Sequence, residues 1–423
     1  MISLILMLVV GTYVCIKYKK NYILCISILS SVYLVFLIAL KEMDVPFTIY
    51  YFFIFSLLAK RKKTIPKDFF LFGVYVFIYV LIGLLFQERM NTLSVLLTRY
   101  GFLFLALLQL SKGLPENVDP TNNFITVIRL GTIVEVAAAI YILLYGDMTN
   151  RLAINNQAVG GSLSIGLIIL SIAVFFMDEN EWSKNHQMTL LIINFVIVVL
   201  SGTRGYMIMS LLPLIPFVYC YTLKRGRSKS KSVVIITVYF IVASLAILYY
   251  DSLLTSVSSL FRLSEGIGYR TNENAYIKAL FRVEPIFNKL FGFGLGGRAD
   301  NVPNNYSIAR TASGTKTWMV YKLLTETTCH NYWYMLLFKQ GILGVAVCSH
   351  LFMQFFLKIR SIRNNNKYLF FSLFLALVGV IISLTFRISG TCGIFEILCI
   401  FWSLDYCKTL NQMVQTSSSY DEL

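Results

Sequence analysis

Long apolar runs recur along this chain from its first residues to near its last, and they constrain the fold more than any other feature. Of its 423 residues, 57% are hydrophobic and only 14% are charged, with a mean hydropathy of +0.70. Many of the runs are long enough to cross the hydrocarbon core of a bilayer as helices. Because a spanning segment must satisfy its own backbone hydrogen bonds, we expect helices. The composition therefore predicts an all-α integral membrane protein.

We expect about thirteen transmembrane helices (twelve to fourteen), judged by run length and hydropathy. They lie near residues 2–16, 23–40, 47–59, 69–86, 92–110, 122–145, 158–177, 189–201, 205–222, 233–250, 331–357, 368–386 and 391–407. The predicted regions are an N-terminal transmembrane bundle, a large external loop, a C-terminal group of spans and a disordered cytoplasmic tail: 1–250, 251–330, 331–408 and 409–423.

The basic residues concentrate in alternate connections between these runs. The chain has 37 Lys+Arg against 21 Asp+Glu, a formal net charge of +16. The clusters lie at residues 17–20, 60–67, 224–231 and 358–367, all on one side under this span list. The positive-inside rule makes that side cytoplasmic. Nucleic acid is excluded as a partner, because the basic residues alternate with spans instead of covering a soluble domain.

The external loop contains a pattern typical of an amphipathic helix. Apolar residues recur at helical spacing, and basic or polar ones recur every four residues on another face. The apolar set is Tyr276, Ala279, Leu280, Val283 and Phe287; the polar set is Arg270, Asn274, Lys278 and Arg282. We predict a helix on the membrane surface that ends at Pro285. The glycine-rich residues 292–297 follow no strand, so we interpret them as a flexible turn and not as a nucleotide-binding loop.

The first candidate for chemistry is Arg204, in a Ser-Gly-Thr-Arg-Gly connection at residues 201–205. Thr203 can cap the next helix, which leaves Arg204 in its first turn at the outer surface. A helix N-terminus with an arginine forms a strong anion site, and guanidinium donors match diphosphate oxygens in pairs. The alternative is a hairpin turn whose arginine reaches lipid headgroups.

The second candidate is Arg270, which begins the basic face that continues through Lys278 and Arg282. These three residues could bind an anionic substrate. The alternative is attraction to anionic lipid, which any basic amphipathic helix shows.

The third candidate is His330, with Asn331, at the boundary between the external loop and an apolar run. Histidine exchanges protons near neutral pH, as a catalytic base requires. Gly341 and Gly344 return near its helical azimuth, where small residues allow another helix to pack closely. The alternative is an interfacial histidine bonded to headgroups. Of the other histidines, His186 falls in a cytoplasmic connection and His350 within a span.

Other charged residues carry weaker signals. Arg151 lies in an outer connection before Asn155 and Asn156. Ionisable residues within spans are interpreted as structural, although such groups are costly and often functional; Lys339 and Glu396 are candidate partners. The external loop has no close Asp-x-Asp pair, so we expect no metal and no cofactor. No Walker motif and no pair of discontinuous transporter-type helices is visible.

Together, these segments resemble the O-antigen ligase and polymerase family of bacterial envelope enzymes. The matching pieces are residues 201–205 opening a span, Gly268-Tyr269-Arg270 in the long outer loop, and His330-Asn331 with Gly341 and Gly344 opening the next span. They occur in the family's order over about residues 150–360. The family's Asn-Pro-Asn-like segment lacks its proline here, at residues 151–156.

The resemblance implies a GT-C-type glycosyltransferase in the bacterial cytoplasmic membrane, with its active site on the periplasmic face. It implies that Arg204 and Arg270 bind the diphosphate of an undecaprenyl diphosphate-linked donor and that His330 lies at the reacting centre. We expect a polymerase of O-antigen or capsule repeat units, with a glycan acceptor, membrane lipids and a chain-length regulator as partners. The alternatives are a ligase, a lipid-linked glycan flippase and a structural subunit.

Overall fold

The computed structural model describes residues 67–87, 89–96, 100, 120–145, 153–154, 157–158, 161–177, 181–201, 204–224, 277–278, 281–282, 284–297, 331–384 and 394–420, with a few residues before position 30. Its helices are α4 (Lys67–Phe86), α5 (Arg89–Val95), α7 (Pro120–Tyr145), α8 (Ser162–Met177), α9 (Glu181–Leu200), α10 (Arg204–Lys224), α13 (Ile286–Phe291), α15 (Tyr332–Arg360), α16 (Lys367–Leu384) and α17 (Ile394–Tyr420). Two short antiparallel strands, β1 (Ala153–Ile154) and β2 (Gln157–Ala158), interrupt this pattern.

Several predicted spans coincide with helices to within a few residues. The spans predicted at 69–86, 122–145, 205–222, 331–357 and 368–386 correspond to α4, α7, α10, α15 and α16. Three helices in the described part are long and apolar enough to cross a membrane: Thr121–Ile142, Tyr332–Arg360 and Lys367–Leu384. Shorter apolar helices are Phe70–Phe86, Leu163–Met177, His186–Leu200 and Tyr206–Tyr221. The chain thus has the apolar helices of a membrane protein.

Two helices extend beyond the predicted limits. α9 begins at Glu181, so His186 lies in a helix and not in a connection, which corrects the prediction. α17 continues to Tyr420, where the sequence predicts a disordered tail from residue 409. The predicted spans near 23–40, 47–59 and 233–250 lie outside the described residues, apart from Ile28.

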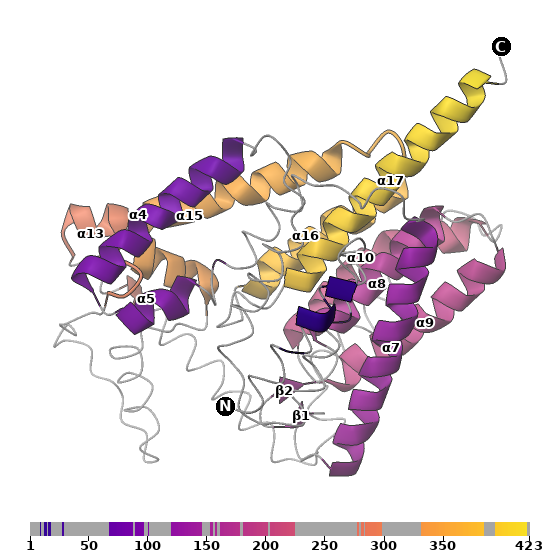
Figure 1. Ribbon diagram of the computed structural model, residues 1–423, viewed down its shortest axis with the longest axis horizontal. Coiled ribbons are helices and arrows are strands. Elements are labelled where there is room, and N and C mark those ends of the chain that lie inside the picture. Colours follow the sequence, from indigo (N-terminus) through magenta and orange to yellow (C-terminus); the bar gives the residue numbers. More distant parts are fainter. Residues whose placement is uncertain are drawn as a thin grey trace.

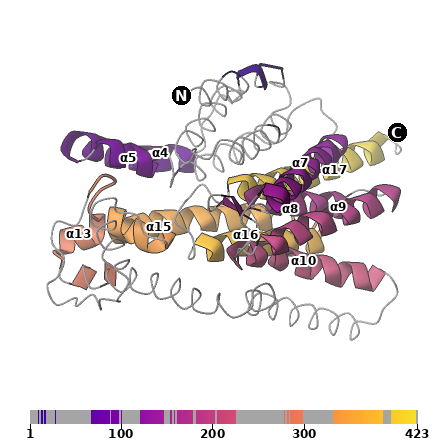
Figure 2. The ribbon, with the colours of Figure 1, turned by 90° about the horizontal axis from the view of Figure 1, so that it is seen from below.

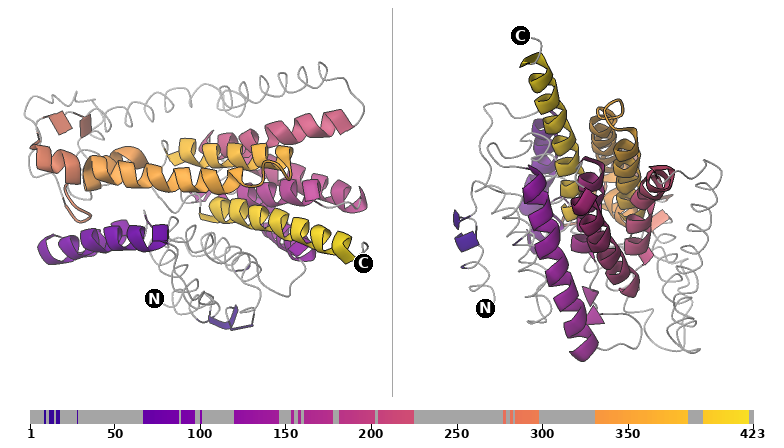
Figure 3. Two further views of the ribbon diagram at one scale, coloured as in Figure 1. Left: turned by 90° about the horizontal axis from the view of Figure 1, so that it is seen from above. Right: turned by 90° about the vertical axis from the view of Figure 1, so that its right-hand side faces the viewer.

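α8 is the central helix of the bundle. Its residues Ile165, Leu167, Ile168 and Leu170 are all fully buried, as expected for a helix that is apolar on every side. It packs on α7, α9 and α17, and also on α10 and α16 (Figure 1). At Gly166 the approach of α17 is so close that an added Cβ would collide with the Phe395 ring. The end-on view in Figure 3 shows these helices side by side.

α15 connects this bundle to a second group of elements. Its far half packs on α16, while its first half packs on the short helix α13. Figures 1 and 2 show α4, α5 and α13 gathered around the beginning of α15, away from α7–α10. The segment before α15 therefore folds back onto the helix that it leads into.

α4 presents a broad apolar surface outward. Its exposed side chains are Phe70, Leu71, Val74, Phe77, Ile78, Leu81, Ile82, Leu85 and Phe86. A soluble monomer rarely exposes so large an apolar patch, whereas lipid solvates it at no cost. This face of α4 fits contact with a bilayer.

Candidate functional site

Asn331 begins α15, directly after His330. Its backbone is extended (φ −101°, ψ 116°), and its Oδ1 accepts hydrogen bonds from the Trp333 and Tyr334 backbone N–H groups at 3.0 and 3.3 Å. Asparagine is among the best N-cap residues because its short side chain satisfies these free donors. The cap fixes the direction in which the chain enters α15 from His330.

The first turn of α15 is anchored by buried aromatic packing. Tyr332 is fully buried, and its ring meets Trp333 edge-on at 5.9 Å. Trp333 in turn lies 5.9 Å from Phe352, further along the same helix. This packing holds the first turn of α15 in one position.

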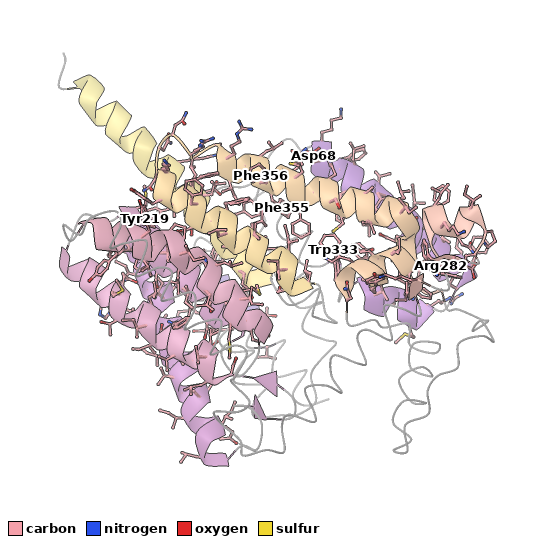
Figure 4. The ribbon with its side chains drawn as sticks, turned by 180° about the vertical axis from the view of Figure 1, so that it is seen from behind. Asp68, Tyr219, Arg282, Trp333, Phe355 and Phe356 are labelled. Atoms are coloured by element: carbon pink, nitrogen blue, oxygen red, sulfur yellow. The ribbon has the colours of Figure 1, made fainter. Side chains whose placement is uncertain are left out.

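The described part of the basic segment, residues 277–278 and 281–282, reaches this turn. Lys278 Nζ lies 5.6 Å from the centre of the Tyr334 ring, within the range of a cation–π contact. Ile277 is buried and Phe281 packs against the core, while Lys278 and Arg282 are exposed. The described part is therefore amphipathic, although its buried face runs through Ile277 and Phe281, which the predicted apolar set omits. Figure 4 shows Arg282 and Trp333 near the same end of α15.

Pro285 interrupts this segment as predicted, but a further helix follows it. Pro285 (ψ 154°) precedes α13, which ends at Gly292 (φ 70°). Phe287, assigned to the longer amphipathic helix, belongs to α13 and is 65% exposed. Its ring lies 4.8 Å from that of Phe291, so α13 offers an apolar surface toward lipid.

α15 is broken at Gly341, where φ is 65° and ψ is −161°. The backbone of Gly292 lies directly opposite: a Cβ built on Gly292 would stand 2.5 Å from the Gly341 nitrogen. A Cβ built on Gly341 would collide with the Leu290 carbonyl. Both positions need glycine, because they combine positive φ with backbone-to-backbone contact.

Residues 292–297, here called the glycine turn, cap the first half of the broken helix. The Phe293 N–H donates to the Phe338 carbonyl at 2.9 Å, and the Gly294 N–H donates to the Lys339 carbonyl at 2.8 Å. The Tyr79 hydroxyl donates to the Phe291 carbonyl at 3.0 Å. These bonds satisfy backbone groups that a helix end leaves free. A turn is present here as predicted, but it is anchored by hydrogen bonds on both sides and is not the flexible turn that the sequence predicts.

Polar side chains surround the break. Gln87, just after α4, donates from Nε2 to the Phe293 carbonyl (2.7 Å) and accepts at Oε1 from the Gly296 N–H (2.9 Å). Lys339 Nζ donates to the Gly297 carbonyl at 2.8 Å, and Gln340 Oε1 accepts from the Tyr75 hydroxyl at 2.9 Å. Lys339 and Gln340 are fully buried. In lipid, a broken helix is tolerated when such groups re-satisfy its backbone.

The structure gives a different reason for the glycine at position 341 than the helix packing that the sequence predicts. We expected a neighbouring helix to pack on Gly341 and Gly344. At Gly341 the partner is the glycine turn; at Gly344 the Tyr75 hydroxyl of α4 lies 3.3 Å from a built Cβ. Gln87, Tyr75 and Tyr79 were missed. The available signal was the polar pair Lys339-Gln340 before a glycine inside an apolar run.

The structure describes only some of the predicted site residues. Arg204 is the first residue of α10, as predicted, but its side chain lies outside the described part, as do Arg151, Arg270 and His330. Asn331, Lys278 and Arg282 are described and lie near the beginning of α15. No cluster of three His, Cys, Asp or Glu side chains suited to a metal occurs among the described residues.

No protein-family model and no curated protein matches the chain. Any functional assignment therefore depends on the motifs, their order and the geometry around α15.

Outside this region, charged side chains also lie on the predicted spans. Arg129 Nε donates to His186 Nε2 at 3.0 Å, which joins α7 to α9. Glu135 and Glu396 are buried within the bundle. Lys339, considered as a partner of Glu396, has the Gly297 carbonyl as a hydrogen-bond acceptor.

Proposed function

We propose that this chain is a membrane-embedded glycosyltransferase that polymerises undecaprenyl diphosphate-linked repeat units of O-antigen or capsular polysaccharide. The observation that carries the proposal is the contact between Lys278 and Tyr334. It brings the basic outer helix to the head of the helix that follows His330. A cationic surface beside a histidine at a membrane boundary suits a diphosphate-linked lipid donor.

In the proposed reaction, an acceptor hydroxyl oxygen attacks the anomeric carbon of the donor sugar. The bond from that carbon to the diphosphate oxygen breaks, and undecaprenyl diphosphate leaves with the bonding pair. His330 takes the hydroxyl proton, while Arg204 and Arg270 stabilise the charge on the leaving group. Lys278 and Arg282 extend the cationic surface along the glycan or diphosphate. The diphosphate supplies the activation, so the reaction needs no nucleotide.

The broken helix supports this proposal because the part of α15 that follows His330 is held at both of its ends. Asn331 caps the outer half of α15, and the glycine turn secures its lower end. Both ends of residues 332–340 are thus held. Catalysis by positioned groups requires such a rigid support, because small misplacements cost large factors in rate.

A matched variant series tests the catalytic roles in purified protein with a diphosphate-linked donor. We expect His330→Ala to lower transfer about a hundredfold or more, as for loss of a general base. Arg204→Ala and Arg270→Ala should each lower it by about a hundredfold, as for loss of a transition-state donor. His350→Ala and Arg89→Ala, at exposed positions, serve as controls. Wild-type transfer by all three site variants would exclude the assignment.

A ligase would use the same residues, so the product distinguishes the two. A strain without a polymerase would display single repeat units on its surface. A strain without a ligase would retain long undecaprenyl-bound chains that are not attached to an acceptor.

The break of α15 at Gly341 favours a flippase as the second candidate, because discontinuous helices are typical of transporters. Transport needs two compartments, whereas transfer does not. Glycan transfer by protein in detergent would support the glycosyltransferase, and movement of the lipid-linked glycan across vesicles without transfer would support the flippase.

A further inference from the structure

Basic side chains gather at the end of α15 opposite Asn331. They come from the last turn of α15, the turn that follows, the start of α16, and α17: Lys358, Arg360, Arg363, Lys367 and Lys408. This group is remote from the candidate site and plays no part in the proposed reaction.

Two of these residues, Lys358 and Lys408, are brought together by packing between α15 and α17. The buried rings of Phe355 and Phe401 meet edge-on at 5.1 Å. Lys358 follows Phe355 by three residues and Lys408 follows Phe401 by seven, so each returns to the contacting face of its helix. Figure 1 shows α17 passing beside the turn between α15 and α16.

The two ammonium groups interact unfavourably. Burial lowers the pKa of Lys408, and the positive charge of Lys358 lowers it further; Asp405 acts in the opposite direction. Holding two half-buried like charges together is costly unless an anion lies between them.

We propose that Lys358 and Lys408 bind a phosphate group, with Arg360 and Arg363 at the rim of the site. Ammonium and guanidinium donors form short, charge-assisted hydrogen bonds with phosphate oxygens. Below Lys358, the exposed side chains of Met353 and Leu357 offer an apolar surface for acyl chains. An anionic phospholipid headgroup satisfies both features, since basic pockets between helices on the cytoplasmic side bind such headgroups. A free phosphate shares the same recognising chemistry.

The test uses full-length protein in detergent and measures retained lipid by native mass spectrometry. We expect wild type to retain phosphatidylglycerol in preference to phosphatidylcholine. Lys358→Gln/Lys408→Gln should weaken this binding by about thirtyfold, since each lysine near a membrane surface contributes about fivefold. Lys17→Gln/Lys67→Gln, which removes two exposed lysines from the same predicted side, should leave binding unchanged. Lys358→Arg/Lys408→Arg should retain phosphatidylglycerol binding, which would show that the two positions tolerate substitution when the positive charge is kept.

A second arm adds inorganic phosphate. If phosphate binds wild type and the Gln pair abolishes that binding, the site takes free phosphate; if phosphate neither binds nor displaces phosphatidylglycerol, the ligand is the lipid. The proposal would be overturned if wild type and the Gln pair bound lipid equally and also bound phosphate equally. An equal loss in the control pair, or no binding of either ligand by wild type, would overturn it as well.

Discussion

At the scale of single residues, the amide of Asn331 combines a structural contact with a position next to the candidate base. Its Oδ1 is engaged by two backbone N–H groups, whereas its Nδ2 forms no hydrogen bond with the described residues. As part of the proposed function, we expect Nδ2 to donate to a substrate oxygen. The two uses can be separated, because a carboxylate at the same position caps a helix equally well but repels a diphosphate.

We expect Asn331→Asp to keep the thermal stability of the protein and to raise the KM for the diphosphate-linked donor. Asn331→Ala should lower both transfer and stability, the latter by about 1 kcal/mol for the lost cap. Thermal unfolding in detergent and steady-state kinetics measure the two effects. Normal kinetics in Asn331→Asp would limit Asn331 to capping.

At the scale of elements, the joint between α15 and the glycine turn depends on glycines that face each other. Gly341 and Gly292 both have positive φ, and neither position has room for a side chain. α4 supports the joint through Tyr79 and Gln87. The outer half of α15 is thus part of a unit formed with α13 and α4.

Gly341→Ala should destabilise this unit by about 2 kcal/mol or more, because it adds backbone strain and a collision with the Leu290 carbonyl. Hydrogen exchange in residues 286–297 and 332–340 should increase. Gly73→Ala is the matched control, since a Cβ there meets nothing within 4 Å. Equal hydrogen exchange in the two variants would contradict the conclusion that glycine is required where α15 meets the glycine turn.

At the scale of the whole molecule, α15 has basic residues at both of its ends. Its beginning meets Lys278, and its end meets the basic group at residues 358–367. The charge pattern predicts that these ends lie on opposite sides of the membrane.

Membrane-impermeant maleimide checks that orientation. We expect Lys278→Cys to react in intact spheroplasts and Asn364→Cys, in the exposed turn after α15, to react only after permeabilisation. The parent chain gives the background; its described cysteines, Cys220, Cys348, Cys399 and Cys407, are buried. Equal labelling of both variants in intact spheroplasts would reject the topology, and labelling of Asn364→Cys alone would reverse it.

The sequence predicts the positions of α4, α7, α15 and α16 well, because long apolar runs report directly on helices in lipid. It does not predict the break at Gly341, since φ there is imposed by Gly292, which lies in another segment. Nor does it identify Gln87, whose role comes only from bonds to Phe293 and Gly296. The local periodicity of the sequence does not predict contacts between such distant segments. The start of α10 at Arg204 agrees with the prediction that Arg204 lies in the first turn of this helix, while the roles of Arg204, Arg270 and His330 stay predictions.

The interruption of α15 affects where in the gene mutations that inactivate this protein should fall. The nine residues after Asn331 depend on a residue that is distant in sequence. Gln87, which follows α4, forms hydrogen bonds with the glycine turn that caps them. Loss-of-function alleles, and the compensating changes that rescue them, should therefore be sought at Tyr75, Tyr79 and Gln87 as well as beside the histidine.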